Sequence, residues 1–261
     1  MTEQSTAPKV KSPAGQRYNL IDIIRALAVI SMVLYHAAWD AFYIFGADMP
    51  WFRSQGAFVW QQCTCITFLT LSGFCISLGR KRVSRALTVL GCSLVIRIVT
   101  VTFMPSSAVR FGVLCLLGSA MLLIGCLDRW LKRVNPYLGM GVCFLFFALT
   151  RYVKDGVLGF FGIELVKLPR VLYTLGHIGS YLGFKSEGFF STDYFPIIPW
   201  IFVCLFGYYL HKIFAERMLM EHLKVRPLPA LEFVGRHALW FYMAHQAVVY
   251  AVMYLIFEII L

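Results

Sequence analysis

Residues 17–45 read RYNLIDIIRALAVISMVLYHAAWDAFYIF, a long apolar stretch that still carries four ionisable side chains. These side chains are Asp22, Arg25, His36 and Asp40. At 100° per residue they share one face of a helix, and the other faces are apolar. Ionisable groups inside a bilayer are costly and usually face a protein interior or a wet cavity. The stretch therefore predicts a membrane-spanning helix whose polar face lines an internal site.

The composition of the whole chain is typical of a polytopic membrane protein. Of its 261 residues, 59% are hydrophobic and 14% are charged, whereas soluble domains have about 25% charged residues. The net charge of +11 comes from basic residues in short segments between apolar runs, which argues against nucleic-acid binding. The eight cysteines lie inside apolar runs, so they are expected to be core residues, and no metal site is expected.

Apolar runs long enough to cross a bilayer predict an all-α, polytopic transmembrane helix bundle. Seven spans are expected, at about 18–39, 56–78, 86–103, 111–127, 137–152, 194–213 and 231–256. Residues 154–193 leave an eighth, short or re-entrant helix open at 168–182. We favour a segment outside the membrane that packs over the bundle. Residues 1–16 are expected to be a disordered cytoplasmic tail, and residues 17–261 a single membrane domain.

The distribution of basic residues predicts the orientation of the chain. Fourteen of the 24 Lys and Arg residues lie in the segments on the side of the N-terminus, and seven lie on the opposite side. The positive-inside rule then places the N-terminus in the cytoplasm, with the inner (cell) membrane as the expected location. Arg25 falls in the cytoplasmic half of the first span, and His36 follows about 16 Å further along.

Two histidines are candidates for proton transfer. His36 and Asp40 are four residues apart, so the carboxylate can orient the imidazole and leave it as a general base. The alternative is a pair that only satisfies buried polarity. His245 lies about 21 Å into the last span, at a depth similar to that of His36. The two histidines are therefore predicted to converge on one cavity, although His245 alone could be a core hydrogen-bonding residue.

Other polar residues each allow a structural and a functional interpretation. Arg25 can pair with Asp22 or also bind an anionic ligand from the cytoplasm. Arg97 can be structural or line a path for a polyanion, and Arg236 and His237 can be interface anchors or phosphate contacts.

Three further candidates lie on the outer side. Asp193 and Trp200 belong to the segment DYFPIIPW, in which Asp193 is a plausible helix N-cap and Trp200 an interface anchor. Arg110 begins the fourth span. All three could instead shape an acceptor site.

Several segments resemble the transmembrane acyltransferases. RYNLIDIIRALAVISMVLYH is similar to the opening of that superfamily, and the spacing of Arg25 and His36 matches the acyltransferase-3 branch. The His36-x3-Asp40 pattern resembles the bacterial relatives of heparan-α-glucosaminide N-acetyltransferase. So do, in this order, RKRVSRAL, RFGVLCLLG, DYFPIIPWIFVCLFGYYL and GRHALWFYMAHQAVV. The resemblance covers residues 17 to about 255, except 135–190.

The resemblance implies acetyl-CoA bound from the cytoplasm and an amino or hydroxyl group of a sugar or glycan as acceptor. His36 would be the essential histidine, with Arg25 as its partner in the signature. From the residues we further expect Asp40 to orient His36 and His245 to join it, in direct transfer or through an acetyl-histidine. The phosphates of the donor would meet Arg25, Arg97, Arg236 and His237. The acceptor would meet Arg110, Asp193 and Trp200.

The expected partners are the lipid bilayer and the glycan, and a homodimer is left open. Two alternatives are a small transporter or flippase, which the intramembrane Arg and His residues would suit, and an inactive family member, which Cys115 keeps open.

Overall fold

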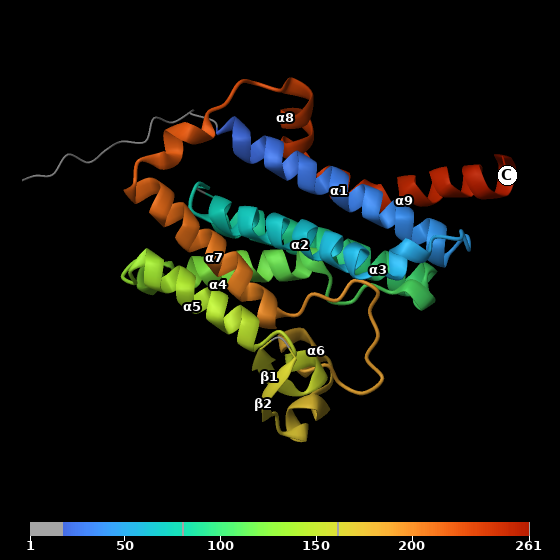
Figure 1. The fold of residues 1–261 in the computed structure, drawn as a ribbon, viewed down its shortest axis with the longest axis horizontal. Coiled ribbons are helices and arrows are strands. Elements are labelled where there is room, and N and C mark those ends of the chain that lie inside the picture. The colour runs from blue at the N-terminus through green and yellow to red at the C-terminus, as the bar shows by residue number, and fades with distance from the viewer. Residues whose placement is uncertain (1–17, 80, 161, 261) are drawn as a thin grey trace, which may run out of the picture.

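The computed structural model describes residues 18–79, 81–160 and 162–260. The tail predicted at residues 1–16 lies outside these ranges. Most of the chain is helical, and one two-stranded hairpin interrupts the helices (Figure 1). The helices are α1 Asn19–Tyr43, α2 Gln55–Ile76, α3 Arg82–Phe103, α4 Val113–Leu131, α5 Pro136–Leu149, α6 Gly176–Leu182, α7 Ile197–Glu216, α8 Pro229–Arg236 and α9 Ala238–Tyr254.

Seven helical segments in the described residues are long and apolar enough to cross a membrane. Their bounds are Asn19–Tyr43, Gln55–Ile76, Arg82–Phe103, Val113–Leu131, Pro136–Asp155, Ile197–Glu216 and Ala238–Ile260. The predicted all-α bundle with seven spans is therefore confirmed, and the chain is a multi-pass membrane protein. The predicted orientation of the N-terminus stays a prediction.

The alternative of an eighth span at 168–182 is excluded. This region contains a short 3-10 helix, Arg170–Thr174, and the seven-residue helix α6, both far shorter than the roughly 20 residues that a span requires. One helix prediction needs correction. The helix predicted at 231–256 is broken at His237 into α8 and α9. The break follows from packing, because Gly235 lies directly against the backbone of Asp22 in α1 and holds α8 there. Apolar patterning along the sequence does not show such a contact.

The core of the bundle lies between α2, α4 and α7. Its fully buried side chains include Leu69, Leu116 and Tyr208. Helices α2 and α7 approach closely because glycines face backbone on both sides, Gly73 against Cys204 and Gly207 against Thr70. Half of the apolar window of α4 is buried. Helix α4 is therefore central in the bundle.

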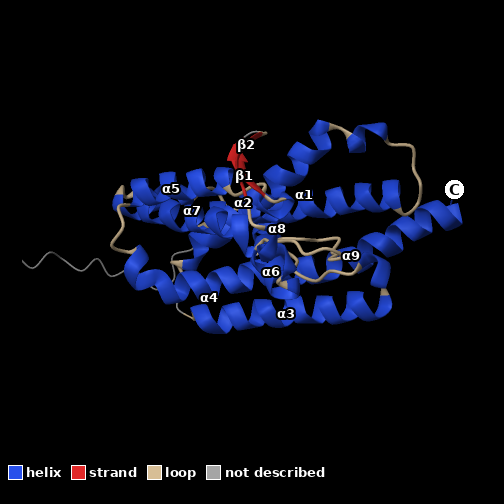
Figure 2. Ribbon diagram, turned by 90° about the horizontal axis from the view of Figure 1, so that it is seen from below, coloured by secondary structure: helices blue, strands red, loops and turns tan. Residues whose placement is uncertain are grey.

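Helix α3 and the β-hairpin lie at the periphery. Figure 2 shows α3 along one edge of the bundle, and Ala86 is its only fully buried residue. Strands β1 Val157–Phe160 and β2 Ile163–Lys167 pair antiparallel. Together with α6 they form a small lobe beside the ends of α5 and α7 (Figure 1). This lobe replaces the eighth helix that the sequence left open.

Candidate active site

Helices α1 and α9 bring His36 and His245 together. Their ring centroids are 4.8 Å apart, and the ring planes are inclined by 58°. The two residues are 209 positions apart in the sequence, and the packing of α9 against α1 brings them together. The two rings therefore meet, as the sequence predicted, while the shared cavity stays a prediction. Their roles in catalysis stay a prediction.

The hydrogen bonds of His245 define its tautomer. Its Nδ1 lies 2.5 Å from the backbone carbonyl oxygen of Tyr242, which can only accept a hydrogen bond, so Nδ1 carries the proton and donates. Within the described residues its Nε2 is buried without a hydrogen-bond partner. In the neutral ring that atom holds a free lone pair. His245 thus presents a basic nitrogen inside the bundle, next to the ring of His36.

Asp40 has a different partner from the one predicted. Its side chain is fully buried, and its Oδ1 and Oδ2 accept hydrogen bonds from Nε2 of Gln246 at 3.1 and 3.0 Å. Within the described residues no hydrogen bond joins it to His36. The spacing of four places both side chains on one face of α1, but α9 crosses that face and supplies the amide. Because Gln246 follows His245, this bond positions the His245 ring relative to α1.

Asp193 caps a helix, but not the helix that follows it. Its Oδ2 accepts a hydrogen bond from the backbone N–H of Val113 at 3.0 Å. It therefore satisfies the start of α4 and meets the positive end of that helix dipole. Helix α7 instead begins after Pro196, without a side-chain cap. Asp193 is therefore an N-cap as predicted, but it caps α4 and not α7, the helix that follows it in the sequence.

Asp193 also connects α4 to the histidine pair. The hydroxyl of Tyr242 donates to the same Oδ2 at 3.4 Å, and the carbonyl of Tyr242 holds His245. Burial raises the pKa of the Asp193 carboxyl to about 6, although the hydrogen bonds from Val113 and Tyr242 act in the opposite direction. Asp193 is therefore placed to support the site through Tyr242. The sequence analysis assigned no role to Tyr242 or Gln246, because their partners lie on other helices.

Arg25 is engaged by three groups near the start of α1. Its Nη1 donates to Asp22 at 2.8 Å and to the carbonyl of Gly235 at 3.3 Å, and its Nη2 lies 3.0 Å from the sulfur of Cys75. The predicted Asp22–Arg25 ion pair is present. Arg25 thus ties α1 to α2 and α8, and this geometry gives it a structural role.

Arg236 and His237 lie exposed at the junction of α8 and α9. Arg236 donates from Nε to the carbonyl of Glu232 at 3.0 Å, and Nδ1 of His237 lies 2.9 Å from the carbonyl of Phe233. Among the described residues, the side-chain hydrogen bonds of both residues go to α8. The outer nitrogens of the Arg236 guanidinium remain accessible to a ligand.

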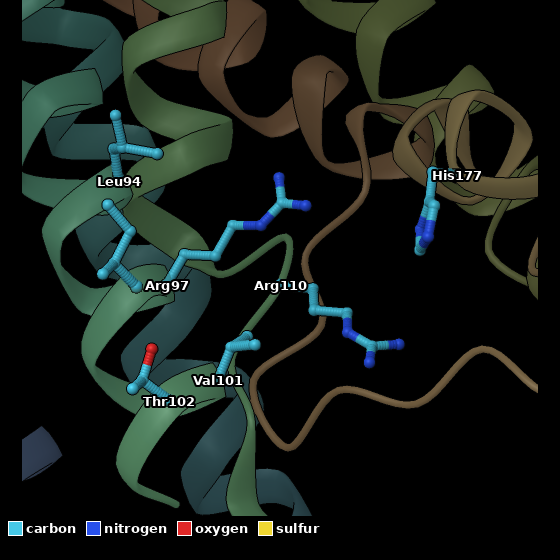
Figure 3. A pocket seen from close by; sticks show the side chains of 7 residues that line it. Leu94, Arg97, Val101, Thr102, Arg110 and His177 are labelled. Atoms are coloured by element: carbon cyan, nitrogen blue, oxygen red, sulfur yellow. The ribbon is translucent and has the colours of Figure 1, made fainter. Parts of the chain in front are cut away.

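Arg97 does not belong with these residues. It lies roughly 22 Å along α3 from Arg82, at the end of the bundle opposite to Arg25. It lines a pocket there with Arg110 and His177 (Figure 3). The four residues predicted to bind the donor are therefore not one cluster, and the correction separates Arg97 from the others.

Trp200 is an aromatic packing residue. Its ring contacts Phe195 and Phe147 at centroid distances of 4.9 and 5.6 Å, and the guanidinium of Arg151 lies 6.0 Å from it. These contacts leave its predicted role in acceptor binding without support.

The sequence matches one protein family over residues 17–247, described as heparan-alpha-glucosaminide N-acetyltransferase, catalytic. The chain belongs to this family. The matched range includes His36, Asp40, Asp193 and His245, so the site lies within the family's catalytic region. The recognised resemblance to this branch is confirmed, and the relation to acyltransferase-3 stays a prediction. Comparisons with curated proteins and with solved structures gave no match.

Membership in this family identifies the chain as a membrane protein of an acetyltransferase family.

Proposed function

We propose that this protein transfers an acetyl group from acetyl-CoA, bound from the cytoplasm, to an amino or hydroxyl group of a sugar outside the inner membrane. The observation that carries the proposal is the free Nε2 of His245 beside His36. A heparan α-glucosaminide is the acceptor that the family description names. The fixed tautomer of His245 is the state that a general base requires.

The proposed chemistry assigns one task to each residue. Nε2 of His245 accepts the proton of the acceptor N–H or O–H while that atom forms a bond to the acetyl carbon. The carbon–sulfur bond of the thioester breaks, and CoA leaves as the thiolate. Tyr242 holds the tautomer of His245 through its carbonyl. Asp40 is a positioning residue, because it acts on the site through Gln246.

His36 has two proposed routes, which differ in the first bond formed. In direct transfer it lines the cavity in which the acceptor attacks the thioester. In the two-step route its ring attacks first and carries the acetyl group to the acceptor. Incubation with labelled acetyl-CoA and no acceptor separates them, because only the two-step route leaves label on the protein.

The residues at the cytoplasmic end fit a phosphate-rich donor. Arg236 is exposed there with free outer nitrogens. Arg85 lies nearby, with its guanidinium over Gly79 at the end of α2. Such cations form strong hydrogen bonds to phosphate. From this end the thioester would have to reach about 16 Å along α1 from Arg25 to His36. Acetyl-CoA would supply the acetyl group as that thioester.

The test uses purified protein, acetyl-CoA and a glucosaminide acceptor. The variants His245→Gln and His36→Gln are each expected to lower the transfer rate by about 10²- to 10⁴-fold, which is the usual contribution of a general base. His222→Gln is the matched control, because His222 is exposed and lies outside the site. Folded His36→Gln and His245→Gln variants with wild-type rates would refute the proposal.

A further inference from the structure

A second site lies at the other end of α3, between α3, the α3–α4 loop and α6. It is a pocket of about 330 Å³. Figure 3 shows Arg97 reaching into it from α3 and Arg110 from the loop, with His177 on the opposite wall. Its lining residues are Leu94, Arg97, Ile98, Val101, Thr102, Arg110 and His177.

Two positive charges in this pocket have no negative partner. Within residues 18–79, 81–160 and 162–260, the guanidinium groups of Arg97 and Arg110 form no salt bridge and no side-chain hydrogen bond. A charge at membrane depth is costly unless it is paired or hydrated. The pocket therefore has an electrostatic preference for an anion.

Aromatic rings hold both guanidinium groups in place. Arg97 lies over Phe111 at 5.7 Å and Arg110 over Phe189 at 5.9 Å. These two phenyl rings stack on each other, with centroids 5.6 Å apart and planes inclined by 13°. Stacking on a ring leaves the N–H edges of a guanidinium free to donate. The two arginines thus present free donors to the same pocket.

The rest of the wall faces lipid. Leu94, Ile98 and Val101 are 55%, 56% and 41% exposed in the isolated chain, and they lie on the outer face of the peripheral helix α3. Arg97 is six residues, or about 9 Å, from the end of α3. A ligand in this pocket can therefore carry a hydrocarbon chain along α3.

From this arrangement we propose that the pocket binds the phosphate head group of a lipid whose chain lies against α3. Phosphate matches the forked donors of two arginines. A neutral lipid would leave both cations unpaired, and a free anion would not use the apolar wall. The pocket is large enough for a head group, while the chain lies outside it in the bilayer.

This lipid site has a consequence for the proposed acetyl transfer, and that part rests on the proposed function. The pocket connects to the histidine pair through Arg110, whose backbone N–H bonds Ser191, and through Asp193 and Tyr242. A lipid held here would present an acceptor that is anchored in the membrane. The substrate class would then be a lipid-linked sugar phosphate.

Binding of radiolabelled farnesyl phosphate to the full chain in neutral detergent tests the site. The Arg97→Gln/Arg110→Gln variant is expected to bind at least about 100-fold more weakly than the wild type, from about tenfold for each charge-assisted contact. Arg53→Gln is the matched control, because Arg53 is an exposed arginine over a phenyl ring at the same end of the bundle. It is expected to bind as the wild type does.

Two further ligands identify the source of affinity. Farnesol and inorganic phosphate are both expected to bind far more weakly than farnesyl phosphate. Equal binding of farnesol, equal binding of free phosphate, or unchanged binding by the double variant would each overturn the proposal. Both single variants are measured as well, so that the result does not depend on the folding of the double variant. The assay contains no acetyl donor, so its outcome is independent of whether the protein transfers acetyl groups.

Discussion

Replacing Gln246 with Leu is expected to destabilise the fold by leaving a buried carboxylate without its donor. Asp40 is 0% exposed, and the Gln246 amide supplies both of its side-chain hydrogen bonds among the described residues. Removing one partner of a buried, charge-assisted pair costs about 3 kcal/mol. In a chain of this length that corresponds to a fall of roughly 6 to 12 °C in Tm.

A double variant distinguishes the loss of the hydrogen bond from the cost of burying an unpaired carboxylate. Replacing both residues, as Asp40→Val/Gln246→Leu, removes the carboxylate together with its donor. A buried polar pair exchanged for apolar side chains of similar volume is often nearly neutral. The double variant is therefore expected to be more stable than Gln246→Leu alone. Acetyl transfer should nevertheless fall in both variants, because the bond that positions His245 is lost in both.

Thermal unfolding in detergent, followed by circular dichroism, measures these effects. Gln61→Leu is the control, because in the part of the chain that the structure describes the side-chain oxygen of Gln61 bonds only its neighbour Gln62. The Tm of this variant is expected to change little. A Gln246→Leu variant with the Tm of the wild type would show that Asp40 does not depend on this amide. A double variant less stable than Gln246→Leu would show that the pair is net stabilising, against the reasoning above.

Two further predictions concern stability. The pKa of Asp193 is raised from 3.8 to about 6, so the native state binds this proton more tightly. The contribution of Asp193 to the free energy of unfolding therefore falls by up to about 3 kcal/mol as pH rises from about 4 to about 6. Asp193→Asn is expected to remove this slope from the pH dependence of Tm, and an unchanged slope would contradict the assignment. Gly73→Ala is expected to lower Tm by the equivalent of about 1–3 kcal/mol, because the new methyl group would meet the Cys204 backbone. Gly91→Ala is the control, because the space around Gly91 is open, and its Tm should not fall. Equal Tm values for the Gly73→Ala and Gly91→Ala variants would contradict the close packing at Gly73.

The positions of the first six spans and the meeting of the two histidines were predictable from the sequence. The length of an apolar run predicts a span, and the rise per residue of a helix predicts the depth of a side chain within that span. His36 and His245 were placed at similar depths by counting along two helices, and the rings do meet.

The partners of Asp40 and Asp193 were not predictable in the same way. The spacing of four suggested His36 for Asp40, because helical periodicity compares residues of one helix only. Its actual partner Gln246 is 206 residues away, and the helix that Asp193 caps begins 80 residues before it. Such choices depend on which helices become neighbours, and an apolar pattern does not determine this.

The break at His237 was missed for the same reason. Residues 231–256 read as one apolar helix, and only the contact of Gly235 with α1 shows why α8 and α9 are separate. The pairing of Arg97 with Arg110 likewise required the fold, because it joins α3 to the loop that precedes α4.

The contacts of α1 also set an order of events during synthesis. The hydrogen bond from Arg25 to the Gly235 carbonyl can form only after 210 more residues have been made. The hydrogen bond from Gln246 to Asp40 can form only after 206 more residues have been made. At about 5–20 residues per second, that interval lasts roughly 10–40 s. During this time α1 carries the Asp40 carboxylate without its Gln246 donor, and Arg25 has Asp22 but not yet the Gly235 carbonyl. The membrane-insertion machinery must therefore keep the polar face of α1 away from lipid until α8 and α9 are inserted. In a nascent chain stalled before residue 229, that polar face would still lack the partners that α8 and α9 supply.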